Sequence, residues 1–316
     1  MLFFDTAEGS TMNEFPSNHS PGTVSAVIQR TVSDFMAGPD NDLGMPQQAE
    51  QAFGQPLLGV ASGIDSIWGT YKAHVGPFHW TPLEAFLLAF PKQVVSACEL
   101  SVICWVLPQT DATRSDQRKE KQVPSERWIR ARVTGEKQVN VGLRNMMVRR
   151  LGELGIEALA PSLLPAWQMV NSEHFGFASS WSERHVAHAA GMGTFGLCDG
   201  LITPVGKSVR IGSVVARTYL EPTVRPYTSH REYCLFFKGK GACGKCIKRC
   251  PAGAISPLGH NKLLCKEYAD TVADAHAYAT MGFKGDSCGL CQTAVPCESD
   301  IPTQEKKAEG ISKGMQ

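Results

Sequence analysis

The spacing of apolar and polar residues predicts helices and strands that follow one another without a regular repeat. Residues 139–154 carry apolar side chains at helical intervals and stop at Gly155, a common residue at helix ends. Residues 100–107 are β-branched and aromatic and end at Pro108, which predicts a buried strand. Residues 180–183 match a capping box, so we expect a helix there that runs to about residue 190.

The other expected elements complete a mixed fold. Residues 109–124 are polar and charged, which predicts a solvated loop. Because helices and strands interleave without a strict strand–helix–strand unit, the pattern favours an α+β sandwich. Further helices are expected at residues 24–36, 83–90, 92–98 and 125–132, and strands at residues 156–160 and twice within 201–216.

Composition divides the chain into four parts. Residues 1–46 are rich in Ser, Asn, Asp, Gly and Pro, which predicts a flexible N-terminal extension or docking arm that is loosely attached. Residues 47–225 hold most of the expected helices and strands, so we expect the α+β domain there. Pro222, Pro226 and Ser229 indicate a linker. Residues 226–303 then form a small cysteine-rich domain, and residues 304–316 a flexible tail.

The overall charge and hydropathy exclude some partners. The 316 residues carry a formal net charge of +1, so no global field recruits DNA or an anionic membrane. The longest apolar runs, at residues 83–90 and 102–107, fall well short of the ~20 residues that span a bilayer. The first residues lack the basic and apolar regions of a secretion signal. We therefore expect a cytoplasmic protein without DNA or a membrane as partner.

The last third of the chain holds eight of the eleven cysteines and the most specific pattern in the sequence. Cys243, Cys246 and Cys250, with Pro251, read C-x2-C-x3-C-P, the core of the bacterial ferredoxin motif. Two closely spaced thiolates bind one [4Fe–4S] cluster, and the Cys before Pro binds the other. The complete motif would begin at position 240, where this chain has Lys240.

Both cysteine motifs depart from the standard run. Cys234 lies six residues before Lys240 and would loop back to supply the missing ligand. In the second motif Cys297 follows Cys291 after five residues, and Pro296 precedes it. By the crossing rule of two-cluster ferredoxins, cluster one takes Cys234, Cys243, Cys246 and Cys297, and cluster two takes Cys265, Cys288, Cys291 and Cys250.

Other uses of the thiols stay open. Eight thiolates could bind two zinc ions, although a C-x3-C-P step is not typical of zinc ribbons. Structural disulfides are not expected in a reducing compartment. The remaining three cysteines have no spacing partner. Cys98 and Cys104 lie in an apolar stretch and fit small core residues, whereas Cys198 lies in a glycine-rich segment.

That glycine-rich segment follows an expected helix. Gly191, Gly193 and Gly196 come after the helix, so they do not form a Rossmann phosphate loop, whose glycines precede one. Glycines allow positive φ and close approach of the backbone to a flat or bulky group. The plain alternative is a crowded turn between a helix and a strand.

Several of these residues resemble a known family. Glu183-Arg184, the glycine segment, and residues 201–204 and 209–215 are similar to epoxyqueuosine reductases and the related reductive dehalogenases. The cysteine groups follow at the distance usual in that family. The similarity covers roughly residues 55–302, and the combination is fairly specific for the superfamily without fixing the member.

The resemblance implies a nitroreductase-like α/β sandwich that binds a corrinoid, followed by a small two-cluster domain of the bacterial ferredoxin type. Electrons from a donor such as reduced ferredoxin or flavodoxin would pass through two [4Fe–4S] clusters to a cobalamin, which carries the chemistry. The cobalamin would contact the glycine turn and the strands after it, at Gly191, Gly193, Gly196, Thr203, Pro204 and Arg210.

Two features differ from the epoxyqueuosine reductases. Their proton-donating Asp corresponds in register to Phe177, which cannot donate a proton. The acid candidates nearby are Glu173 and His174, both of which also fit ordinary surface residues. Many tRNA-acting members continue into a helical repeat domain, which this sequence does not have after Cys297.

The substrate stays open between a small molecule and a tRNA nucleoside. A net charge near zero argues against a strong tRNA-binding face, and Arg144, Arg149 and Arg150 fit the solvated face of one expected helix. We expect an iron–sulfur oxidoreductase that resembles epoxyqueuosine reductase. The alternative is a non-catalytic, ferredoxin-like electron-transfer protein without a corrinoid.

Overall fold

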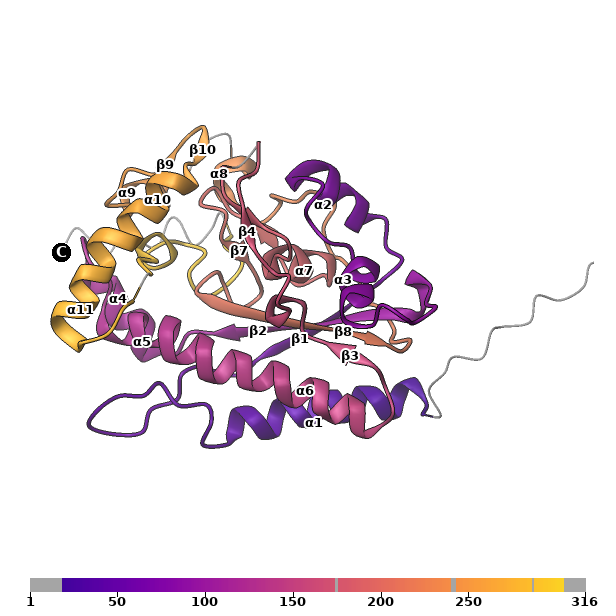
Figure 1. The fold of residues 1–316 in the computed structure, drawn as a ribbon. Helices are drawn as coiled ribbons and strands as arrows, with labels where there is room; N and C mark the ends of the chain where they lie inside the picture. The colour runs from indigo at the N-terminus through magenta and orange to yellow at the C-terminus, as the bar shows by residue number, and fades with distance from the viewer. Residues whose placement is uncertain (1–18, 174–175, 240–242, 286, 304–316) are drawn as a thin grey trace, which may run out of the picture.

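A four-stranded antiparallel sheet forms the centre of the fold (Figure 1). The computed structural model describes residues 19–173, 176–239, 243–285 and 287–303. In spatial order the strands are β1 (Leu57–Ser62), β2 (Leu100–Pro108), β8 (Val209–Arg217) and the short β3 (Ala158–Leu159). β2 is buried along its whole length. The sheet and the helices on both of its faces agree with the mixed helix-and-strand fold expected from the sequence.

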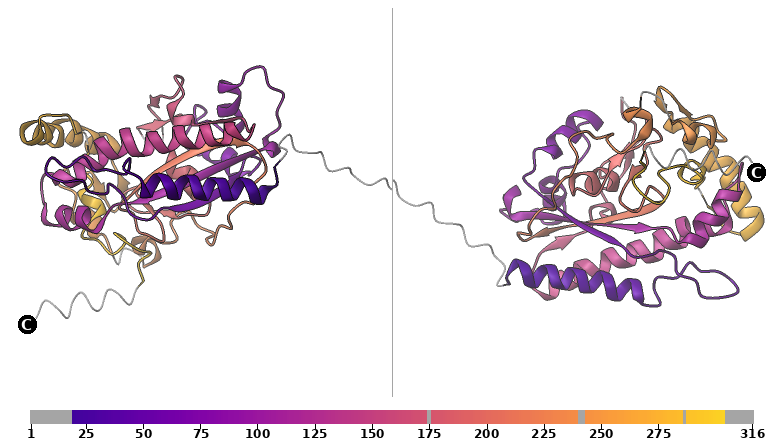
Figure 2. Two further views of the ribbon diagram at one scale, coloured as in Figure 1. Left: turned by 90° about the horizontal axis from the view of Figure 1, so that it is seen from below. Right: turned by 180° about the vertical axis from the view of Figure 1, so that it is seen from behind.

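One face of the sheet is covered by α1 (Pro21–Ala37) and α6 (Val141–Glu153), seen below the strands in Figure 1 and from below in Figure 2. Val24, Ile28 and Phe35 of α1 are buried in the core that Trp105 and Val214 form on this face. The expectation of a loosely attached arm is therefore wrong for α1, because its apolar side chains complete this core. Residues 1–18 and 304–316 lie outside the described part of the chain.

The other face carries α2 (Ile67–Val75), α3 (Pro82–Ala89) and α7 (Glu183–Ala189). Trp68 and Trp181 stack there with ring centroids 6.0 Å apart. The helix expected at residues 92–98 is reduced to the 3₁₀ turn η1 (Ala97–Glu99). The short elements within residues 161–202 are η3 (Pro161–Leu163), β4 (Met169–Val170), β5 (Ala178–Ser179), β6 (Thr194–Phe195) and β7 (Leu201–Ile202).

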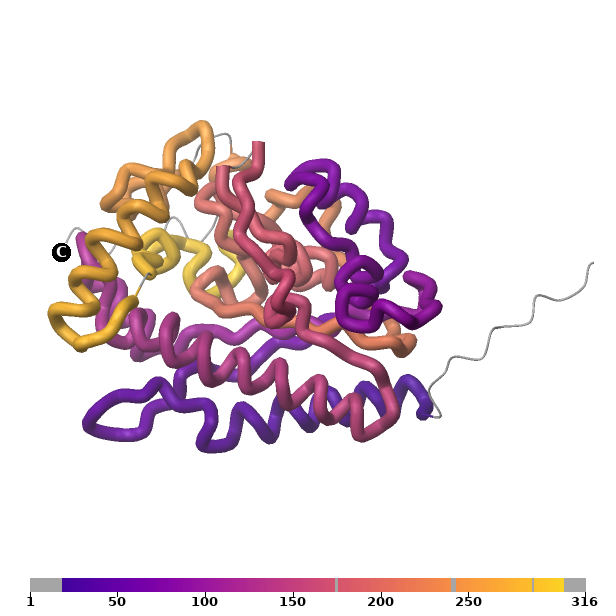
Figure 3. The backbone as a smooth tube through the Cα atoms, in the orientation of Figure 1, coloured from indigo at the N-terminus to yellow at the C-terminus, as the bar shows by residue number. Residues whose placement is uncertain are grey.

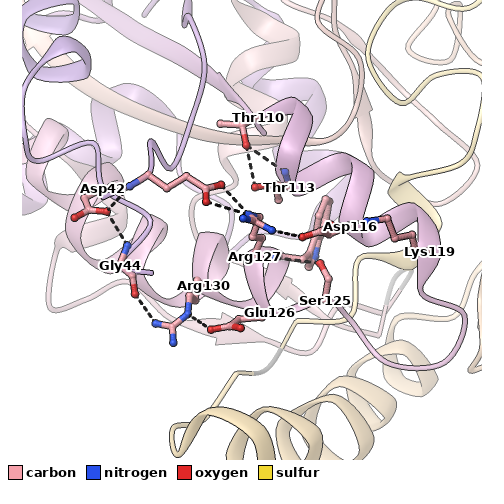
Figure 4. Close-up of polar contacts among 12 residues, drawn as sticks. Asp42, Gly44, Thr110, Thr113, Asp116, Lys119, Ser125, Glu126, Arg127 and Arg130 are labelled. Atoms are coloured by element: carbon pink, nitrogen blue, oxygen red, sulfur yellow. Dashed lines mark hydrogen bonds and ion pairs between the residues drawn. The ribbon is translucent and has the colours of Figure 1, made fainter. Parts of the chain in front are cut away.

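The loop expected at residues 109–124 is instead largely the helix α4 (Asp111–Lys119), followed by α5 (Glu126–Thr134). Thr110 caps α4 by accepting from the N–H of Thr113, which the sequence reading overlooked. Arg127 of α5 then binds both Glu50 and Asp116 and ties the two helices to the loop before β1 (Figure 4). The polar side chains of this segment therefore belong to the exposed faces of helices and not to a loop.

Arg144 is buried, although the sequence suggested that it lies on a solvated helix face. It is only 2% exposed, and its guanidinium binds Glu136 at 2.9 Å and Glu183 at 3.1 Å. β3 pairs with only two residues of β8, so the β8 edge beyond it is open, and Arg144 donates to the carbonyl of Ile211 there. Asn140, from the π-helical turn η2 (Gly135–Asn140), donates to the same carbonyl.

The cysteine-rich module lies beside α4 and α5, at the upper left of the tube in Figure 3. The side chain of Arg249 lies between the cysteine loops, and its guanidinium donates to the carbonyls of Gln117 and Glu120. Gln117 donates to the carbonyl of Cys288 at 2.8 Å. The module comprises α8 (Leu235–Lys238), α9 (Lys245–Lys248), β9 (Ile255–Ser256), β10 (Gly259–His260), α10 (Lys262–Tyr268), η4 (Ala269–Ala273), α11 (Asp274–Met281) and η5 (Leu290–Gln292).

No helix in the described ranges is both long enough and apolar enough to cross a membrane.

Candidate metal centre

Four thiols that are far apart in the sequence line one pocket. Cys234 precedes α8, Cys243 and Cys246 surround the start of α9, and Cys297 follows η5. Gly244 adopts a left-handed conformation with φ of 75°, and this turn lets both neighbouring cysteines face the pocket. The four are the set expected for cluster one, and apolar side chains such as Phe236 and Val295 close the walls around them.

The second set of thiols lies next to the first. Cys250, Cys265 and Cys288 are close enough for their charges to interact, and burial raises the pKa of Cys288 to about 11. Burial likewise raises the pKa of Cys297 to about 11. A thiol with such a pKa keeps its proton at neutral pH unless a metal replaces the proton, as metals do when they bind cysteine.

The fit of these donors to a metal depends on their type and on their arrangement around a pocket. Iron–sulfur clusters are held by four thiolates, and the four thiols expected for cluster one line one pocket. Their chemistry fits a sulfur-ligated cluster, and the ligand assignment stays a prediction. Among the described residues, no three His, Cys, Asp or Glu side chains form a group that could hold a metal ion.

Two residues beside the pocket were not found by sequence spacing. Lys207 is buried, and its Nζ lies 3.2 Å from the Sγ of Cys198. Cys198 in turn interacts with Cys246 of the first set and Cys291 of the second. Burial alone would lower the pKa of Lys207, but the surrounding sulfur atoms raise it well above its usual range. The available clue was a lysine within the otherwise uncharged residues 200–208.

A histidine beside the second set carries a pH-dependent contact. His260 Nδ1 lies 3.2 Å from the carboxylate of Asp199, the residue after Cys198. Burial opposes the charge of His260, but its bonds to Asp199 and Cys265 raise its pKa to about 9. The folded pKa exceeds the unfolded value, so the stabilisation is complete below about pH 6.5 and is lost as pH rises through 9.

We expect the free energy of unfolding to fall as the pH rises from 6.5 through 9, by less than the ~3 kcal/mol of the full pKa shift because Cys265 causes part of that shift. Urea unfolding of the anaerobic protein at several pH values measures the fall. Asp199 has a φ of 57°, which Asn tolerates, so Asp199→Asn is a matched control that removes the charge alone. The same fall in Asp199→Asn would contradict the assignment to this pair.

The glycine turn expected to line a corrin ring is packed against the protein's own backbone. A Cβ on Gly191, whose φ is 73°, would lie 2.5 Å from the carbonyl oxygen of Val224. A Cβ on Gly193 would lie 2.3 Å from that of Ile202, whereas a Cβ on Gly196 would lie 3.3 Å from the carbonyl oxygen of Gly200. The contacts of Gly191 and Gly193 alone require glycine, which favours the crowded turn between a helix and a strand.

The other residues named for the corrin ring lie apart from one another. Thr203 is fully buried and its hydroxyl donates to the carbonyl of Gly206, while Pro204 is exposed. Arg210 acts on Glu136 and shares its face of β8 with Val214, on the α1 and α6 side of the sheet. The glycine turn follows α7, on the opposite side. These residues therefore do not form one surface for a corrin ring.

The structure adds little support for a proton-donating role of the two acid candidates. Glu173 is exposed in the turn between β4 and β5, as expected of an ordinary surface residue. His174 lies outside the described residues. Phe177 is half-buried, with the ammonium of Lys266 5.7 Å from its ring centre. A proton-donating role for Glu173 or His174 stays a prediction.

Three histidines that the sequence analysis did not single out lie around Tyr71. The Tyr71 hydroxyl lies 2.5 Å from His188 Nδ1, and the His185 ring is centred 4.8 Å from that of Tyr71. His79 lies 5.4 Å from His185. Burial lowers the pKa of all three histidines, that of His188 to about 4, which favours the neutral form of each ring.

A second, larger pocket of ≈ 410 Å³ lies away from the thiols. It lies between the π-helical turns η2 and η4. Its lining consists of one apolar residue, Val133, and side chains of both charges, namely Arg132, Glu136, Lys137, Asp270, Asp274 and Lys284.

The solved structures that match this chain include epoxyqueuosine reductases and a reductive dehalogenase. The epoxyqueuosine reductase from Bacillus subtilis is 17% identical with a TM-score of 0.44, and the match covers 90% of this chain and 68% of that one. The enzyme from Streptococcus thermophilus is 14% identical with a TM-score of 0.45, covering 89% and 68%. A catabolic reductive dehalogenase is 14% identical with a TM-score of 0.47, covering 92% and 39%.

No family model and no curated protein sequence matches the chain. The chain spans about two fifths of the length of the dehalogenase. At these scores the likeness does not fix a substrate or a cofactor, which depend on the chain's own residues.

Proposed function

We propose that this protein is an iron–sulfur oxidoreductase in which eight cysteines hold two [4Fe–4S] clusters. It would take electrons from a donor of the reduced ferredoxin or flavodoxin type and pass them to a reducible small molecule. The observation that carries the proposal is the pocket lined by Cys234, Cys243, Cys246 and Cys297. The crossing rule grouped these four from their spacing, although Cys297 lies 63 positions after Cys234.

The chain's own residues would bind the clusters, orient them and exclude water. Each cluster, when bound, takes up and releases one electron at a time. The thiols supply the ligands, and the apolar side chains of Leu197, Phe236 and Val295 keep the first pocket dry. Arg249 fixes the loops that carry the second set by donating to the carbonyls of Leu290 and Thr293. In this proposal the sheet domain is nitroreductase-like and the cysteine module ferredoxin-like.

An aromatic path leads from the first pocket toward the sheet domain, which supports electron delivery in that direction. Tyr233, next to Cys234, packs edge-on against Tyr227 with ring centroids 5.6 Å apart. Tyr227 lies 5.1 Å from His188 on α7, and its hydroxyl donates to the carbonyl of His188 at 2.5 Å. The path ends at the Tyr71–His188 contact inside the sheet domain.

A second candidate function is a ferredoxin-like electron carrier without a corrinoid. It is favoured by the glycine turn, where Gly191 and Gly193 face the chain's own backbone and leave no shared surface with Arg210. Assays with reducible small molecules and with tRNA identify the acceptor.

Anaerobic purification with iron, zinc and cobalt analysis tests the proposal. We expect about eight iron atoms per chain. Zinc in place of iron, or about four iron atoms, would contradict two clusters. Titration with cobalamin, followed by absorbance and electron paramagnetic resonance, then separates the two candidates. A base-off cobalt signal would add a corrinoid to the enzyme, and no response would leave the carrier.

A further inference from the structure

Cluster binding alone does not explain the buried ammonium group of Lys207. The side chain is 3% exposed, and its Nζ lies 3.2 Å from Cys198 Sγ. Removing an ammonium from water costs several kcal/mol unless opposite charge surrounds it. The largest charge effects that oppose this cost come from the sulfur atoms of Cys198, Cys297, Cys291 and Cys246.

Glu298, the buried carboxylate in the loop that Lys207 and Ser208 contact, already has its own partners. Glu298 binds Arg118 at 2.5 Å through Oε1 and accepts from the N–H of Ala294 at 2.6 Å through Oε2. Glu298 therefore has strong partners on both oxygens. The charge of Lys207 is left to be balanced by the sulfur pocket itself.

The backbone holds Lys207 in this position. Its N–H donates to the carbonyl of Cys297 at 2.9 Å, and the N–H of Ser208 donates to that of Glu298 at 3.2 Å. Gly206, with φ of 77°, packs so closely that a Cβ would lie 2.2 Å from the Glu298 carbonyl oxygen. The turn before β8, and with it the backbone of Lys207, is thus fixed to the loop of a predicted cluster ligand.

A fixed buried cation has a definite effect on an iron–sulfur cluster. A [4Fe–4S] cluster with four thiolates is anionic, and reduction adds one more negative charge. Net charge and hydrogen bonds around a cluster set its reduction potential. Because the interaction is in a region of low dielectric, a buried ammonium stabilises the reduced cluster much more than an exposed one does.

We propose that Lys207, held by a hydrogen bond to Cys198, raises the reduction potential of the cluster bound by Cys234, Cys243, Cys246 and Cys297. Cys198 is then a ninth thiol of the region that positions Lys207 and binds no iron. The inference rests on the proposed function, since it requires the clusters. The step it affects is the transfer of one electron from an external donor to the oxidised cluster, with no bond made or broken.

Redox titration with dithionite, followed by electron paramagnetic resonance, tests this in four proteins. Lys207→Met removes the charge at similar length, Lys207→Arg keeps a charge, and Lys245→Met removes an exposed lysine beside Cys246. We expect about eight iron atoms in each variant. In Lys207→Met the ratio of reduced to oxidised cluster at a given potential should fall at least tenfold, a shift of 59 mV to lower potential. Lys207→Arg and Lys245→Met should stay near the wild type.

The outcomes separate the inference from the proposed function. Wild-type protein without about eight iron atoms would overturn the function itself. Eight iron atoms with an unchanged potential in Lys207→Met, or an equal shift in Lys245→Met, would overturn the inference alone. Should Lys207→Met load less iron, Lys207→Gln replaces it, and iron loss in both variants also overturns the inference by making Lys207 a structural residue. Cys198→Ala should keep its iron; a fall to about four atoms would make Cys198 a ligand.

Discussion

Replacing Cys234 with alanine is expected to lower the iron content from about eight to about four atoms per chain. Cys234 is the ligand whose spacing departs most from the ferredoxin motif, yet it lines the pocket with the three other predicted ligands of cluster one. A cubane held by three thiolates loses its fourth corner and becomes labile, whereas the second set of thiols is untouched. Iron and sulfide analysis of the anaerobically purified variant measures the loss.

The matched control for this change is Cys98→Ala. Cys98 is exposed and its thiol contacts Ser96, so its removal should leave the iron content as it is. Unchanged iron in Cys234→Ala would refute the place of Cys234 in cluster one. Equal loss in both variants would point to general oxidation of the protein rather than to a ligand.

Replacing Arg144 with methionine is expected to lower the free energy of unfolding by about 3–5 kcal/mol. The change leaves the carboxylate of Glu183 without a charged partner, although the hydroxyl of Ser213 still donates to it at 2.6 Å. It also removes a donor to the Ile211 carbonyl at the open edge of β8. Urea unfolding followed by circular dichroism gives the change in free energy.

Two further measurements identify the cause. Burial already raises the pKa of Glu183 with Arg144 in place, and loss of Arg144 raises it further. A raised carboxyl pKa penalises the folded state at high pH, so the defect should shrink as pH falls toward 5. Adding Glu183→Gln should recover part of the stability. Arg150→Met, on the exposed face of α6, should leave the stability unchanged, and a defect of the same size there would contradict this account.

The elements that sequence predicted well are those whose pattern reflects one local rule. β2 reads as a buried strand because every position is apolar or small, and α6 because its apolar residues recur at helical spacing. α4 was missed because its nine residues are almost all polar, and its helical state shows only in the Thr110 cap and in contacts with the cysteine module. Arg144 was misjudged because its partner Glu183 lies 39 residues away.

The candidate site shows the same contrast between features set by local spacing and features set by long-range packing. Short spacings such as Cys243 to Cys246 could be interpreted from sequence, because ligand geometry limits the chain between two thiols. The crossing rule extended this to Cys297, which lines the same pocket. Lys207 and Cys198 could not be found in this way, because what joins them to the thiols is the packing of the turn before β8 against the last cysteine loop.

The docking of the cysteine module has a consequence for engineering by domain exchange. Gly289, between Cys288 and Cys291, packs against the indole of Trp128 so closely that a Cβ would lie 2.1 Å from its Nε1. Arg249 and Gln117 join the same loops to α4. A chimera cut at the linker near residue 226 would separate these loops from the surface that shapes them. A transplant that keeps the module intact has to carry residues 111–134 with it, so the smallest exchangeable unit is discontinuous in sequence.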